Sequence, residues 1–171
     1  MKTLAKLCKP DDRQRFTGGS PKDYHAHLQT LVLADIVPED VRKQFEVVRN
    51  LMLYGWFVYE FYTVGAGQAL ACLEFGLREA YVASVGGDGQ HRKGLARYIE
   101  WAEKSGLLPD GVFHERINRL VSSVRNSLAH GGTTLLNYAL AIPQLEVTAD
   151  MLNAVYSALE ERKANGEEGV G

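Results

Sequence analysis

The chain has 171 residues, of which 46% are hydrophobic and 23% are charged, and these values are typical of one globular domain with a buried core. The formal net charge of −2 excludes a broad electrostatic surface for nucleic acid or an anionic membrane, so any RNA contact has to come from a few cations in a cleft. Cys8 and Cys72 match no metal or redox spacing, which favours a cytoplasmic location.

The first half of the chain predicts a polar arm followed by two helices. Residues 1–20 include the turn-forming TGGSP and are expected to form a flexible arm. A helix should begin at Pro21 with Ser20 as its cap, and a second should run from Pro38 to about Tyr62. The apolar run 51–62 is shorter than the ~20 residues that span a bilayer, so we expect no membrane segment. The apolar run 51–62 predicts either a core helix or a dimer interface, because aromatic residues are enriched in interfaces.

The second half predicts further helices and one irregular connection. TVGAG at 63–67 permits a bend, and helices are expected over 69–85, 95–104 and 111–129. Residues 131–147 favour an irregular crossover or a short β excursion, before a last helix over 149–164 and a frayed tail over 165–171. The sequence therefore predicts an all-α fold, a compact bundle of five to six helices in a single domain over 21–164.

The stretch VRNSLAHGG, residues 124–132, closes the helix expected over 111–129. Apolar residues recur there at intervals of three and four and form a core-facing stripe: Ile117, Leu120, Val121, Val124 and Leu128. Asn126 falls opposite this stripe, His130 lies about 40° from Asn126, and Arg125 borders the stripe. The three polar groups can therefore converge on one patch away from the core.

A purely structural interpretation of this helix end is also open. A cation in the last turn complements the negative end of the helix dipole, and Gly131 stands where a left-handed C-terminal cap forms. Spacing alone does not separate a helix cap from a functional site.

The segment RNSLAH resembles the motif of HEPN domains, which is an arginine, a polar residue directly after it, and a histidine after four to six intervening positions. Here these residues are Arg125, Asn126 and His130. Helix order and motif placement extend the resemblance over residues 40–162. It implies a helical bundle, often dimeric, of a family in which many members are metal-independent ribonucleases of toxin–antitoxin, antiviral and RNA-processing systems. Other members have lost catalysis and serve as binding modules.

The chemistry that the resemblance implies is physically coherent and needs no metal or other cofactor. His130, with an ordinary pKa near ~6.5, would transfer protons at neutral pH. Arg125 would hold phosphate oxygens with its planar guanidinium, and Asn126 would orient the histidine or donate to phosphate. The expected partners are RNA, a second copy of the chain in a homodimer, and an antitoxin or other protein. The alternative is a catalytically silent HEPN-like module that binds a partner protein or a nucleotide.

Two further groups of residues are candidates for binding. The densest basic stretch, GQHRKGLAR, contains Arg92, Lys93 and Arg97, which either guide an RNA backbone or form a solvated helix start. His25 and His27 would point about 200° apart on a helix, so a shared metal ion is not expected.

Overall fold

The structure is a computed structural model that describes residues 2–3, 6, 8–85, 94–129 and 135–167. These residues form six α-helices and one 3-10 helix, with no strand among them. In chain order the elements are η2 (Asp12–Phe16), α1 (Pro21–Thr30), α2 (Glu39–Tyr54), α3 (Glu60–Val85), α4 (Leu95–Lys104), α5 (Val112–Ala129) and α6 (Tyr138–Glu167). The predicted all-α bundle is confirmed.

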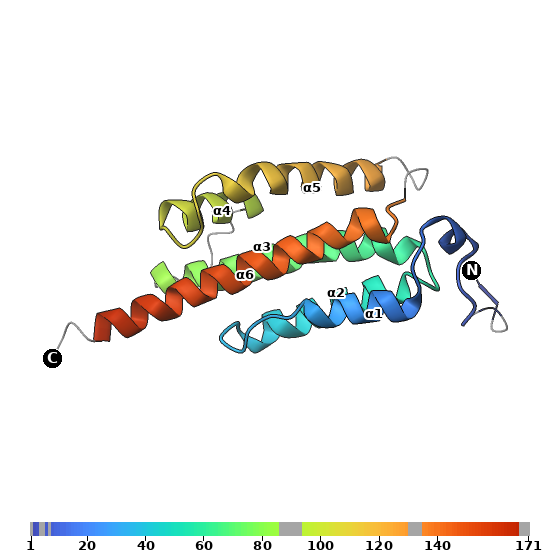
Figure 1. Cartoon of the computed structure of the whole chain (residues 1–171). Coiled ribbons are helices and arrows are strands. Elements are labelled where there is room, and N and C mark those ends of the chain that lie inside the picture. Colours follow the sequence, from blue (N-terminus) through green and yellow to red (C-terminus); the bar gives the residue numbers. More distant parts are fainter. Residues whose placement is uncertain (1, 4–5, 7, 86–93, 130–134, 168–171) are drawn as a thin grey trace.

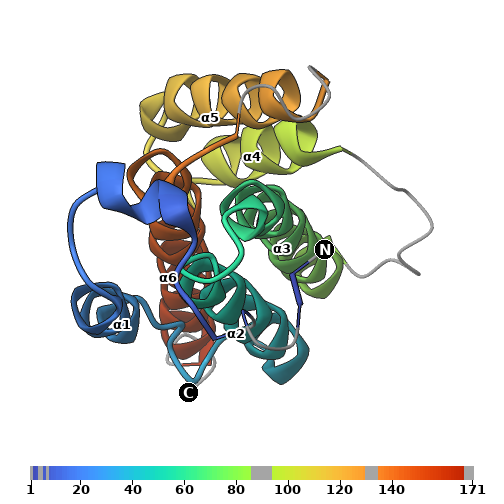
Figure 2. The ribbon, with the colours of Figure 1, turned by 90° about the vertical axis from the view of Figure 1, so that its right-hand side faces the viewer.

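The long helices α3 and α6 lie side by side through the middle of the bundle (Figure 1). Three hydrogen bonds join α3 to α6 and to the residue just before it, and the residue numbers increase together on both sides. They are Leu136 N–H to Thr63 Oγ1 (3.0 Å), Thr148 Oγ1 to Ala69 O (3.1 Å) and Tyr156 OH to Gly76 O (3.0 Å). The two helices therefore run parallel. Helices α1 and α2 cover one side of this pair, and α4 and α5 cover the other (Figure 2).

Glycines on α3 allow its neighbours to approach closely. A Cβ at Gly76 would lie 2.5 Å from Leu152 Cδ2 and 3.1 Å from Val41 Cγ1, and one at Gly65 would lie 3.3 Å from Leu51 Cβ. Because a glycine backbone presents no side chain, α2 and α6 both pack directly against α3 at these points.

The break in the aromatic segment lies earlier than the sequence predicted. The expected helix 38–62 ends at Tyr54, and α3 begins at Glu60 and continues as unbroken helix through the glycines of 63–67. The reason is tertiary packing: a Cβ at Gly55 would lie 2.3 Å from the ring of Tyr62, so the turn folds back onto that buried side chain. The close packing of Gly65 against α2 favours continued helix over a glycine bend.

The expected irregular crossover was wrong over residues 138–147, because α6 begins at Tyr138 and contains Pro143 in its interior. Asn137 Oδ1 accepts the Leu140 N–H at 2.9 Å and caps the helix. Ala141, Leu145 and Val147 are buried where α6 packs on α3, and this burial offsets the hydrogen bond that proline removes. The tail expected to fray from 165 is still helical through Glu167.

The second half of the expected flexible arm is packed against the bundle. η2 is capped by Asp11, and Gln14 within it is 4% exposed. Gln14 Nε2 donates to Gly55 O at 2.9 Å and to Tyr62 OH at 3.2 Å. The arm therefore closes over the turn between α2 and α3. Among the described residues, no helix combines the length and apolar character needed to cross a membrane.

We expect Gly76→Ala to lower the free energy of unfolding by about 1–3 kcal/mol, because the new methyl group overlaps the fully buried Leu152. Gly67→Ala on the same helix is the matched control. Its nearest neighbour would be Val124 Cγ1 at 3.8 Å, so the helix propensity of alanine should leave stability equal or higher by up to ~1 kcal/mol. Urea denaturation measures both variants, and equal stabilities for the two would contradict the close α3–α6 contact.

Candidate functional site

The motif singled out in the sequence forms the end of α5. This helix extends from Val112 to Ala129, so Arg125 and Asn126 belong to its last turns, as predicted. The side chains of both residues, and His130 altogether, lie outside the described residues. The convergence of the three side chains therefore stays a prediction.

Helix α5 packs on the bundle through one face. Ile117 and Val124 are 3% and 4% exposed, and Leu120 and Val121 are packed against the core beside them. The exposed positions on the other face are Asn118, Arg119 and Ser122. The predicted apolar stripe is confirmed at these positions, while the side chain of Leu128 lies outside the described residues. The face that the sequence assigns to Asn126 is thus the solvent face of α5.

The end of α5 lies near the beginnings of α3 and α6. The chain leaves α5 at Ala129 and is held again at Leu136, whose N–H donates to the buried hydroxyl of Thr63 on α3. Val124 lies opposite Gly67, one turn further along α3. The three helix ends gather at the side of the bundle that also carries η2 (Figure 1). A site at the end of α5 would therefore form at this end of the molecule.

The basic stretch is described only in part. Arg92 and Lys93 lie outside the described residues. Arg97 is in the first turn of α4, where its side chain is 74% exposed and its Nη1 lies 3.4 Å from Glu100 Oε2. This weak surface contact fits the solvated helix start as well as it fits a role in RNA binding.

A charged cluster that the sequence did not reveal fastens the N-terminal segment to α3. Arg13 binds Asp11 with two hydrogen bonds, at 2.7 and 2.8 Å, and reaches Glu60 at 2.8 Å. Its guanidinium also lies 4.4 Å from the centre of the Tyr59 ring. Hydrogen bonding to Arg13 lowers the pKa of Asp11 from 3.8 to about 2. Local spacing could suggest the Asp11–Arg13 pair, but Glu60 is brought there only by the fold.

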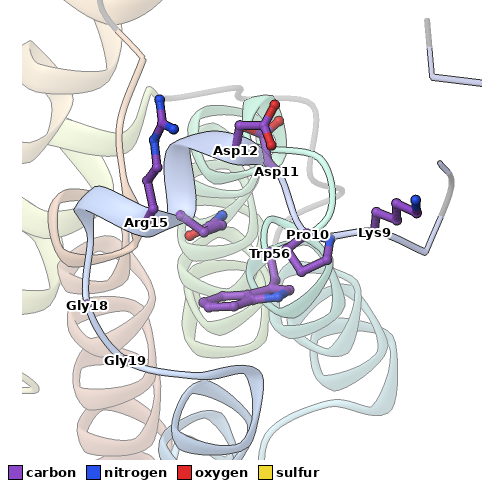
Figure 3. Close-up of a pocket in the computed structure, with 9 residues that line it drawn as sticks. Lys9, Pro10, Asp11, Asp12, Arg15, Gly18, Gly19 and Trp56 are labelled. Carbon is purple, nitrogen blue, oxygen red and sulfur yellow. The ribbon is translucent and has the colours of Figure 1, made fainter.

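Beside this cluster, η2, the following glycine turn and Trp56 line an open cavity of about 580 Å³. Figure 3 shows the Trp56 ring beneath η2, with the Arg15 and Lys9 side chains extending in different directions. Asp11 and Asp12 add carboxylates to the same wall. Because the two cations do not converge and acids stand beside them, this cavity is not organised to hold an anion.

A second group missed by sequence reasoning joins α1 to α6. His27 Nδ1 lies 3.1 Å from Tyr138 OH, and His27 Nε2 lies 3.4 Å from Glu146 Oε1. The rings of Tyr24 and Tyr138 are stacked, with centroids 3.8 Å apart. Burial raises the pKa of Tyr138 well above its ordinary value, so its hydroxyl stays protonated and available as a hydrogen-bond donor. His25, by contrast, is exposed, and the two histidines of HAH have separate surroundings.

Within the described parts of the chain, no three His, Cys, Asp or Glu side chains come together as metal ligands would. No protein-family model, curated protein or solved structure matches the chain. The residues themselves are therefore the basis for assigning a function.

Ile117→Ala should destabilise the protein by about 2–5 kcal/mol, because it removes a buried side chain from the inner face of α5. Ser122→Ala, on the exposed face of the same helix, should change the free energy of unfolding by less than ~0.5 kcal/mol. Chemical denaturation compares the two. Similar losses from both would mean that α5 is oriented differently.

The Asp11 carboxylate should make stability depend on acid pH. The pKa of Asp11 is depressed in the folded protein. Its contribution to the free energy of unfolding is therefore complete above pH 3.8 and is lost as the pH falls towards about 2. Asp11→Asn cannot titrate at this position. The stability difference between wild type and Asp11→Asn should therefore shrink over this range, as measured by urea denaturation at several pH values. A difference independent of pH would refute the ion pair.

Proposed function

We propose that this protein is a HEPN-like, metal-independent endoribonuclease, which acts in the cytoplasm within a toxin–antitoxin or defence system. The observation that carries the proposal is the position of Arg125 and Asn126 in the last turns of α5, within an all-α bundle. The opposite side of α5 packs on the core through Ile117 and Val124, which leaves its outer face accessible to a substrate. This placement agrees with the family resemblance of the RNSLAH segment.

In the proposed reaction, the 2′-hydroxyl of RNA attacks the adjacent phosphorus. The 2′-O–P bond forms while the P–O5′ bond breaks, which leaves a 2′,3′-cyclic phosphate and a 5′-hydroxyl end. His130 provides proton transfer to or from these oxygens, and Arg125 stabilises the negative charge that develops on the phosphate. Asn126 orients the histidine or donates to phosphate.

A homodimer is part of the proposal. Val47 and Tyr54, seven residues apart on α2, are 52% and 54% exposed, and Val64 on the neighbouring α3 is 50% exposed. The hydrogen bond of 3.1 Å between Gln68 Nε2 and Gln44 Oε1 joins the two helices without a net charge. The exposed apolar side chains on these two neighbouring helices support self-association, because a second copy of the chain would bury them. An antitoxin or another protein is the proposed second partner.

The test is cleavage of mixed RNA by purified protein. Wild type should cleave RNA equally with and without chelator. His130→Ala should lower the rate about 100- to 10,000-fold, the usual contribution of general acid–base catalysis. Arg125→Lys should stay clearly impaired, because lysine keeps the charge but loses the planar pair of donors.

The matched control is His25→Ala, which removes an exposed histidine from α1 and should leave cleavage unchanged. Circular dichroism should confirm equal folding of all variants. RNA left intact by wild type across about pH 6–9, where a histidine of ordinary pKa titrates, would favour the silent binding module. Cleavage that survives His130→Ala would exclude the proposed mechanism.

A further inference from the structure

A cavity of about 650 Å³ lies where α3, α4 and α6 approach their ends. This is the side of the bundle opposite the N-terminal segment (Figure 1), so the cavity is separate from the end of α5 and from the cavity beside η2. The connection between α1 and α2 contributes Ile36 and Pro38 to its wall. Its volume lies within the range of ~300–1,000 Å³ that is usual for small-molecule sites.

The walls of this cavity are largely apolar. Trp101, Leu107, Tyr156 and Leu159 line it, and Trp101 is held edge-on against Tyr81 with ring centroids 5.2 Å apart. The small side chains of Ala83 and Ser84 on α3 leave the space open. Ile36 and Val85 are 44% and 56% exposed at its edge. A ligand with an apolar body would cover these surfaces and gain the free energy of burying them.

The polar part of the cavity is cationic on balance. Arg162, Lys163 and Glu160 lie along α6, which gives the three side chains a net charge of +1. Arg162 Nη2 donates to the backbone oxygen of Ser105, and this contact uses only one of the five N–H groups of a guanidinium. Lys163 Nζ is 3.7 Å from Glu160 Oε2, and both side chains are well exposed. Both cations therefore have donors to offer to an anionic ligand.

We propose that this cavity binds a small carboxylic acid with an apolar body. The carboxylate lies at Arg162 and Lys163, and the hydrocarbon lies between Trp101 and Leu159. Charge complementarity selects the head group, since charge-assisted hydrogen bonds to a carboxylate are stronger than neutral ones. The apolar walls select the body. This site is independent of the proposed RNA cleavage.

Trp101 provides a direct signal for binding. The chain has two tryptophans, so the tryptophan fluorescence of the Trp56→Phe variant reports on Trp101 alone. Titration of this variant with sodium decanoate should give a saturable change in emission. Decyltrimethylammonium, which has a similar chain and the opposite charge, should bind at least about tenfold more weakly, a difference of 1.4 kcal/mol. Calorimetry of wild type with decanoate should give the same affinity as the variant.

Two sets of variants test the location. In the Trp56→Phe background, the double substitution Arg162→Gln and Lys163→Gln should weaken decanoate binding by about tenfold or more, because both carboxylate donors lose their charge. Ala83→Leu should block binding by filling the cavity. Lys43→Gln, an exposed change on α2 outside the cavity, is the control and should bind like the parent. Equal affinity for decanoate and decyltrimethylammonium, or unchanged decanoate binding in the double variant, would overturn the proposal.

Discussion

The fold depends on the close, parallel contact between α3 and α6. A backbone carbonyl in the middle of α3, that of Gly76, accepts the hydroxyl of Tyr156, and the absence of a side chain at Gly76 lets Leu152 pack against the helix. Thr148 makes a similar contact about two turns earlier, to Ala69 O. Buried hydroxyls that reach a main-chain oxygen require a fixed distance between helices, because an unpaired polar group in the core is costly. The outer helices pack on a pair whose spacing is already determined.

The two ends of this central pair have different chemistry. At the end where α3 and α6 begin, polar contacts dominate: Gln14 lies in the core, Arg13 connects two acids, and His27 contacts Tyr138 and Glu146. At the end where the helices finish, apolar side chains leave an unfilled cavity. Many directional contacts hold the first end in one arrangement, and the cavity there has acids and cations in its wall, whereas the cavity at the second end is lined largely by apolar side chains. The end of α5, which carries the proposed catalytic residues, belongs to the first.

The contacts at the polar end also explain why the N-terminal segment is structured without a large apolar surface. Gln14 donates to the carbonyl of Gly55 and to the hydroxyl of Tyr62, and both residues are buried. Arg13 adds charge-assisted hydrogen bonds and a contact with the face of Tyr59. The segment expected to form a flexible arm is thus held on the bundle, because the turn between α2 and α3 supplies partners for its polar residues.

The sequence by itself determined the helical class, the capped start of α1 at Ser20, and the inward face of α5, because these follow from local hydrogen bonding and from a 3.6-residue apolar repeat. It also located Arg125 and Asn126 at the end of α5. Only the tertiary structure decided where α2 ends, that α3 passes straight through its glycines, and that α6 begins before Pro143. At the end of α2 the turn folds back onto the buried ring of Tyr62, and in α3 and α6 burial against another helix overcame the local signal for a break. The clusters around Arg13 and His27 were likewise decided by the fold, since they join residues 47 to 119 positions apart, and no local pattern relates residues at such separations.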